Sequence, residues 1–234
     1  ETGAWHLDGV DIPGLINSTN EDGTIPYKLQ YLDLRLGHTC NLKCIMCSPH
    51  DSSMWVPDYK KIIPIIQSPL IRKQVVMDVD SFNNYWHERP EFWEEIFEQI
   101  PNIRQLYFAG GEPLLMEEHY NILEELLRRG RTDVRLIYNT NFTHTDLKGE
   151  SVFDFWKEFD SVAVGASLDA MGPRAEYIRK GTDWAVVEQN RSDMLAICPQ
   201  VDFYISPTLS IMNAKHLPQF HRAWVEAGLI KPQD

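Results

Sequence analysis

Segments with the pattern of β-strands alternate with helical stretches along most of this 234-residue chain, and this alternation limits the fold more than any other feature. Strand patterns rich in β-branched and aromatic residues occur at 31–36, 103–109, 134–139, 161–167 and 201–209. Helical patterns occur at 117–130, 184–198 and 214–228. Strands that alternate with helices form parallel β–α–β units, so we predict an α/β fold.

The distances between these strands predict one long insertion. The second to fifth strands start at residues 103, 134, 161 and 201, and these intervals suit one β–α unit each. The first strand starts at residue 31, so residues 48 to about 100 must hold more than one loop and one helix. Residues 1–30 show no clear period and are predicted to be an irregular N-terminal lead-in to one domain at 31–234.

Composition argues against several classes of function. The net charge is −12, which disfavours the extended phosphate contact that nucleic-acid binding needs. No apolar run reaches the roughly 18 residues of a membrane span, and no basic-then-apolar leader is visible. Four cysteines are few for a secreted disulfide scaffold, so we expect a cytoplasmic protein.

Three of those cysteines crowd into eight positions after the first predicted strand, as Cys40, Cys44 and Cys47. Their odd number and short spacing argue against structural disulfides. Thiolates select zinc, copper(I) or iron–sulfur clusters. Zinc stays open, because His38 or His50 could complete a Cys3His site. Three cysteines on a cubane cluster would instead leave one iron without a protein ligand.

Four sequence motifs resemble those of the radical S-adenosylmethionine (SAM) superfamily, in the order of that family. The first is CNLKCIMC (40–47), which fits C-x3-C-x-Φ-C with Met46 where an aromatic residue is commoner. The second is GGEPLL (110–115), and the third is YNTNFTH (138–144). The fourth is SLDAMGPRAEYIRKG (167–181), which resembles a segment of members with SPASM or twitch domains. The resemblance runs from about residue 31 to 230.

This resemblance implies a fold, cofactors and a reaction. The fold would be a partial (β/α)6-type barrel, truncated before its last strand, because only five strands are predicted. The cofactors would be SAM and a [4Fe–4S] cluster on the three cysteines. Reductive cleavage of SAM would yield a 5′-deoxyadenosyl radical that abstracts hydrogen from an unknown substrate, a peptide or a small molecule. Expected partners include an external electron donor such as flavodoxin or ferredoxin, with no nucleic acid and no membrane. The alternative is a non-catalytic α/β binding module stabilised by an iron–sulfur cluster or zinc.

The resemblance also implies which residues bind SAM, although each has a plainer interpretation. Glu112 could be a solvated carboxylate at a helix start, and Arg179 a solvated helix-end residue rather than a carboxylate clamp. The asparagines could be turn residues, and the serine and aspartate a cap and a turn. The implied residues are Met46, Gly110, Gly111, Glu112, Pro113, Asn139, Asn141, Ser167, Asp169 and Arg179.

Three further expectations concern the remaining chemistry-bearing residues. Cys198 shares a helical face with apolar residues and is predicted to lie in the core. Residues 50–60, with Trp55, are expected to cover the mouth of the site. A helix after Pro90, with Trp93, is expected to pack on the outer side of the barrel. The substrate-directed catalytic residues stay unassigned.

Overall fold

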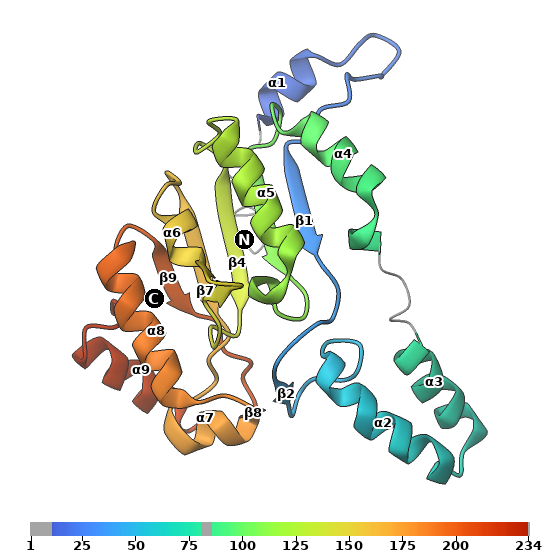
Figure 1. The fold of residues 1–234 in the computed structure, drawn as a ribbon, viewed down its shortest axis with the longest axis vertical. Coiled ribbons are helices and arrows are strands. Elements are labelled where there is room, and N and C mark those ends of the chain that lie inside the picture. Colours follow the sequence, from blue (N-terminus) through green and yellow to red (C-terminus); the bar gives the residue numbers. More distant parts are fainter. Residues whose placement is uncertain (1–10, 81–85, 234) are drawn as a thin grey trace.

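The structure is a computed structural model that describes residues 11–80 and 86–233. At its centre lies a sheet of five parallel strands in the order β1-β3-β4-β7-β9 (Figure 1). The strands are β1 (Tyr31–Arg35), β3 (Gln105–Ala109), β4 (Arg135–Thr140), β7 (Val162–Ala166) and β9 (Asp202–Ile205). All five predicted strands are present, which confirms the α/β prediction. The predicted strand at 201–209 was too long, because Pro207 lacks the N–H that continues a ladder.

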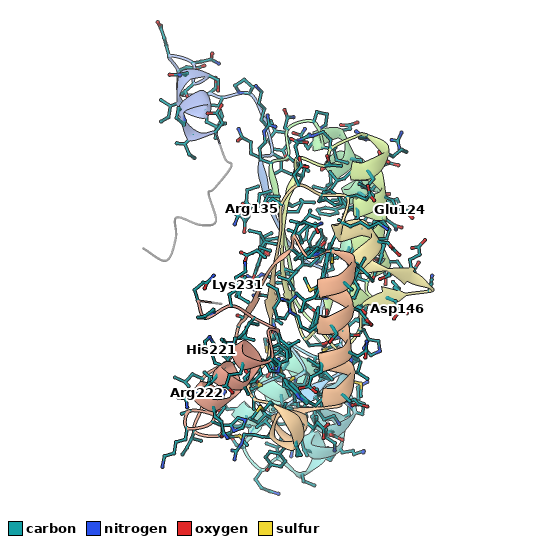
Figure 2. All side chains as sticks on the ribbon, turned by 90° about the vertical axis from the view of Figure 1, so that its left-hand side faces the viewer. Glu124, Arg135, Asp146, His221, Arg222 and Lys231 are labelled. Atoms are coloured by element: carbon teal, nitrogen blue, oxygen red, sulfur yellow. The ribbon has the colours of Figure 1, made fainter. Side chains whose placement is uncertain are left out.

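Helices cover one face of this sheet: in the side view of Figure 2, Glu124 of the helix layer and Arg135 of the strands lie on opposite sides. In Figure 1, α5 (Glu117–Arg128), α6 (Val152–Trp156) and α8 (Trp184–Ile197) lie in front of the strands. The last helix of the described chain, α9 (Leu217–Glu226), packs Trp224 against Phe203 of β9. None of the helices in the described residues is long and apolar enough to span a bilayer.

Alternation along the strands separates two groups of buried side chains. Leu106 and Phe108 of β3 belong to the main hydrophobic core beneath the helices. Tyr107 and Ala109, which alternate with them, belong to a smaller cluster on the other face. Cys198 is 1% exposed and belongs to the main core, which confirms its predicted structural place.

Two short antiparallel ladders lie outside the main sheet. In one, β2 (Lys43–Cys44) of the loop after β1 pairs with β8 (Arg179–Lys180), which follows α7 (Gly172–Ile178). The other joins β5 (Asp146–Leu147) to β6 (Glu150–Ser151). The first ladder ties the cysteine loop to a segment 135 residues further along the chain.

The predicted insertion contains several helices. Its described elements are η2 (Ser53–Trp55), α2 (Val56–Ile62), η3 (Ile63–Ile65), α3 (Pro69–Asp80), η5 (Trp86–Glu88) and α4 (Pro90–Gln99). Helix α4 buries Ile96 in the main core, so the helix after Pro90 packs on the helix-covered side of the sheet as expected.

The lead-in is not wholly irregular, contrary to the prediction. Residues 12–17 form a short helix, α1 (Ile12–Asn17), because the Asp11 side chain accepts a hydrogen bond from the Gly14 N–H at 2.9 Å. The first ten residues of the predicted lead-in lie outside the described residues.

Candidate active site

A cavity of about 560 Å³ opens where β1, β3, β4 and β7 end. The carboxyl ends of parallel strands are where α/β proteins place their chemistry. Nine of the thirteen predicted site residues line this cavity: Cys40, Cys44, Cys47, Gly110, Gly111, Asn139, Asn141, Ser167 and Arg179. The structure therefore brings together residues that lie as much as 139 positions apart in the sequence, from Cys40 to Arg179.

The three cysteines of the loop are free thiols, and nitrogen donors lie beside the sulfurs of Cys40 and Cys44. The backbone N–H of Leu42 donates to Cys40 Sγ at 3.4 Å, and the Asn141 side-chain amide lies 3.8 Å from the same atom. Arg179 Nη1 lies 3.9 Å from Cys44 Sγ. Such donors stabilise sulfur that carries negative charge.

The protonation of the thiols differs along the loop. Burial raises the pKa of Cys40. A hydrogen bond between Cys44 and Cys47, together with burial, raises the pKa of Cys44, while the same bond lowers the pKa of Cys47. The positive charge of Arg179 favours the thiolate form of both. Since a metal binds the thiolate, metal binding at this loop would release the protons of these thiols.

Side chains from distant segments hold the cysteine loop in place. Asn141 Nδ2 donates to Asn41 Oδ1 at 2.9 Å, and Asn41 Nδ2 donates to Thr143 Oγ1 at 2.8 Å. The buried Ser52 hydroxyl donates to the Leu42 carbonyl at 2.6 Å. These bonds satisfy polar groups of the loop and restrict its conformations before any ligand binds.

The two glycines after β3 allow two backbones to approach each other. A Cβ on Gly110 would lie 2.8 Å from the Gly37 carbonyl oxygen, and one on Gly111 would collide with the Thr39 carbonyl. The backbone N–H of Gly111 donates to that Gly37 oxygen at 2.9 Å. Their absent side chains therefore let the β3 loop hydrogen-bond to the cysteine loop, beyond any role in contacting a ligand.

The Glu112 carboxylate is buried behind the cavity wall rather than solvated or exposed to it. It accepts hydrogen bonds from Thr140 Oγ1 at 2.6 Å and from the Asn141 N–H at 2.7 Å. It also caps the short helix η6 (Pro113–Leu115) through the Leu114 N–H at 3.2 Å. Burial raises its pKa to about 7, although these hydrogen bonds act in the opposite direction. In this structure Glu112 joins the ends of β3 and β4.

Arg179 does form a carboxylate clamp, but the carboxylate is that of Asp169. Its Nε lies 2.7 Å from Asp169 Oδ2, and its Nη2 lies 3.2 Å from Asp169 Oδ1. The Asp169 side chain is fully buried and the Arg179 side chain is 12% exposed, so the arginine is not a solvated helix-end residue. Asp169 itself does not line the cavity.

Asn139 and Ser167 lie on the cavity wall at the ends of β4 and β7. Asn139 Nδ2 donates to the Tyr107 hydroxyl at 2.6 Å. Gly165 leaves room for this asparagine, because a Cβ added at Gly165 would lie 2.9 Å from Asn139 Oδ1. Met46 is 39% exposed and Pro113 is buried, and neither lines the cavity.

Several wall residues were not among the predicted site. Arg35 and Tyr107 stand at alternate positions of β1 and β3, so strand periodicity was a usable signal for them. Trp86 and His87 come from the insertion. The aromatic content of the insertion was a usable signal for Trp86, whereas His87 carried no spacing signal. The other additions are Gly37, His38, His50, Asp51, Ala109 and Thr140.

The expected cover of the site is only partly right. His50 and Asp51 line the cavity, but Trp55 does not, since its indole N–H donates to the Cys44 carbonyl at 3.0 Å. Trp86 is the tryptophan on the wall. It stands next to His87, whose Nδ1 lies 3.1 Å from Glu118 Oε1.

The donor set of the loop fits an iron–sulfur cluster. Three thiols line one cavity, with N–H and guanidinium donors directed at two of the sulfurs, which is the environment that tunes such clusters. His38 and His50, either of which could complete a Cys3His zinc site, line the same cavity. In the part of the chain that the structure describes, no three His, Cys, Asp or Glu side chains lie close enough together to hold a single metal ion.

Comparisons with known proteins identify the family and the fold of this chain. Residues 34–191 match the radical SAM superfamily. No curated protein matches the chain. A similar solved structure is anSMEcpe with bound AdoMet and the Cp18Cys peptide, at 22% identity and a TM-score of 0.56, over 87% of this chain and 49% of that one.

Another similar structure is SuiB of Streptococcus suis. Bound to S-adenosylmethionine, it matches at 13% identity and a TM-score of 0.52, over 92% of this chain and 40% of that one. Bound to the precursor peptide SuiA, it matches at 13% identity and a TM-score of 0.52, over 92% of this chain and 41% of that one. This chain thus spans half or less of the length of the solved structures it matches.

Proposed function

Because this chain belongs to the radical SAM superfamily, we propose that its cysteine loop and the adjoining cavity form a SAM-cleaving site. The family uses a [4Fe–4S] cluster and SAM. Cys40, Cys44 and Cys47 would hold the cluster. Reduced by an external donor such as flavodoxin or ferredoxin, it would supply the electron for cleavage of SAM to methionine and a 5′-deoxyadenosyl radical, and this radical would take a hydrogen atom from a substrate. The observation that carries the proposal is that Cys40, Cys44 and Cys47 line one cavity together with the ends of four neighbouring strands.

The residues of this chain would hold and tune the thiolates. The Leu42 N–H and the Asn141 amide direct donors at Cys40, and Arg179 places a positive charge beside Cys44. Because a guanidinium stays charged at any working pH, it favours negative charge on the sulfurs throughout. Asp169 keeps that guanidinium in position through two hydrogen bonds.

Polar groups at the strand ends would bind SAM. Asn139, Asn141 and Ser167 present amides and a hydroxyl to the cavity, and these suit the ribose hydroxyls and the amino-acid end of the molecule. The loop at Gly110 and Gly111 brings backbone to the same wall. We assign Met46 to SAM through its backbone, and Glu112, Pro113 and Asp169 as supports of the residues that line the wall.

We propose a peptide or protein as the substrate, with a small molecule as the alternative. Two similar solved structures hold peptides, namely Cp18Cys in anSMEcpe and SuiA in SuiB. Their sequence identity to this chain is low, so they show a shared fold. The peptides that they hold are the reason for proposing this substrate class. The proposal leaves the substrate-directed acid or base unassigned.

Anaerobic reconstitution tests the proposal. The wild type should bind about four irons, and Cys40→Ala, Cys44→Ala and Cys47→Ala should each lose the cluster signal in absorbance and electron paramagnetic resonance. Cys198→Ala is the matched control, since this cysteine lies in the core, and it should keep the cluster.

Addition of dithionite and SAM to the reconstituted protein should then yield 5′-deoxyadenosine, measured by chromatography. A cluster that forms on the three cysteines without any 5′-deoxyadenosine would instead support the non-catalytic binding module. Tight binding of one zinc and no iron would rule out the iron–sulfur assignment itself.

A further inference from the structure

Residues 56–80 of the insertion form a lobe that contributes almost nothing to the hydrophobic core. The lobe consists of α2, η3 and α3 and stands apart from the sheet and its helices in Figure 1. Neither α2 nor η3 buries a residue, and α3 buries only Val79. No residue of 56–80 belongs to either core cluster. Many apolar side chains of this lobe therefore stay in contact with water.

The most exposed of these side chains gather at the tip of the lobe, residues 62–71, with the sequence IIPIIQSPLI. Pro64 and Pro69 interrupt helix formation there, so the chain turns back on itself. The exposed aliphatic residues of the tip are Ile62 (40%), Ile65 (68%), Leu70 (78%) and Ile71 (56%).

Basic residues flank the tip on both sides. Lys60 and Lys61 directly precede it, and Arg72 and Lys73 directly follow it. Residues 59–77 contain no Asp or Glu, although the whole chain carries a net charge of −12. The lobe thus presents an apolar tip flanked by basic residues, on a protein with a net negative charge.

The base of the lobe is fixed to the rest of the molecule. Lys43 Nζ lies 2.6 Å from Asp58 Oδ2, and the Trp55 indole N–H, at the start of the lobe, bonds to the Cys44 carbonyl. Arg72 Nη2 donates to the Ile66 carbonyl at 2.6 Å, which ties the two sides of the tip together. The tip is therefore held out on a folded support and not on a loose tail.

We propose that this tip docks on the anionic surface of a lipid bilayer. A bilayer accepts aliphatic side chains at its acyl boundary, and its phosphates lie at the depth of the flanking lysines and arginine. A second copy of the chain would bring two sets of flanking basic residues together, so charge repulsion disfavours self-association through the tip. A peptide partner would be expected to lie along a groove, whereas these residues occupy the projecting end of a helical hairpin (Figure 1). The inference does not depend on the proposed SAM chemistry.

Vesicle flotation of the full chain tests the proposal. The wild type should float with vesicles of phosphatidylcholine that contain phosphatidylglycerol, and binding should fall at least about tenfold with pure phosphatidylcholine or at high salt. The double variant Ile65→Asp with Leu70→Asp should lose at least about tenfold in partitioning, because the tip can no longer enter the acyl boundary. Lys60→Gln with Lys61→Gln should weaken binding to the anionic vesicles and not to the neutral ones.

Ile211→Asp is the matched control, because Ile211 is 99% exposed but lies in the loop after β9, away from the lobe. It should bind vesicles like the wild type. All variants should melt like the wild type, since none replaces a buried side chain. The proposal is overturned if the wild type does not float, if the Ile65 and Leu70 substitutions leave flotation unchanged, or if the same substitutions instead abolish a dimer seen by light scattering.

Discussion

The guanidinium of Arg179 lies against the carboxylate of Asp169 through two hydrogen bonds, at 2.7 and 3.2 Å, while its third nitrogen lies 3.9 Å from Cys44 Sγ. Asp169 Oδ1 also accepts the Thr208 N–H at 2.7 Å. One buried ion pair thus connects the loop after β9 to the cysteine loop. It fixes a positive charge beside a predicted metal ligand without exposing its counter-charge to the cavity.

Replacement of either partner of this pair should destabilise the fold. Asp169→Asn leaves a buried guanidinium without its counter-charge, and we expect a loss of about 3 kcal/mol in the free energy of unfolding, measured by urea denaturation. Arg179→Lys should also destabilise, because an ammonium cannot make the paired contact. Arg104→Lys, in the solvent-exposed Arg104–Asp133 pair, should change stability by less than about 1 kcal/mol. Equal losses in the free energy of unfolding at the two pairs would show that the buried pair stabilises the fold no more than the exposed one.

Burial of Glu112 should make the protein less stable as the pH rises. Its pKa is raised to about 7, so the unfolded state loses the proton first, and stability falls as the pH increases from about 4.5 through 7. Over this range the free energy of unfolding of the wild type, relative to that of Glu112→Gln, should fall by about 3 kcal/mol. Any constant loss of hydrogen bonds in Glu112→Gln cancels in this difference. A pH-independent difference would show that Glu112 stays ionised in the folded protein.

His119 should have the opposite effect at acid pH. It is fully buried among aromatic rings, its Nε2 lies 3.0 Å from the Tyr138 hydroxyl, and burial lowers its pKa to about 3. Because the unfolded state binds the proton first, this contribution to stability is present above about pH 6.5 and is lost as the pH falls toward 3. Between pH 6.5 and 4, the free energy of unfolding of His119→Gln should fall by about 3 kcal/mol less than that of the wild type. An equal loss in both proteins would show that His119 is not held neutral in the folded protein.

A methyl group at Gly111 should loosen the junction between the two loops of the site. It would collide with the Thr39 carbonyl, a backbone atom that cannot rotate away, so Gly111→Ala should cost about 1–3 kcal/mol and weaken SAM binding measured by calorimetry. Gly130→Ala is the comparison, because it tests a positive φ of 68° with nothing within 4 Å of the added carbon. That variant should lose some stability and keep its SAM affinity. Unchanged SAM affinity in Gly111→Ala would show that the contact between the two loops does not contribute to SAM binding.

Local sequence was sufficient for the strands and for the cysteine loop. Alternating polarity marks a strand wherever one face is buried, so all five strands were found, with errors at ends such as that before Pro207. The spacing of Cys40, Cys44 and Cys47 is set by covalent chain length, so their joint presence on one loop needed no tertiary information. Helix α1 was missed because one cap, Asp11, and a single short turn give almost no periodic signal.

Only the tertiary structure decided where the polar side chains of the site point. Glu112 and Asp169 each stand in a recognisable motif, yet Glu112 faces Thr140 and Asp169 faces Arg179, because buried carboxylates turn toward whatever donors the fold supplies. Trp86 rather than Trp55 reached the cavity wall for a similar reason, since the path of the insertion is set by contacts such as that of Trp93 with the His87 carbonyl. Sequence spacing determines which groups lie near each other along the chain, but the orientation of a buried polar group depends on partners that only folding brings within hydrogen-bond distance.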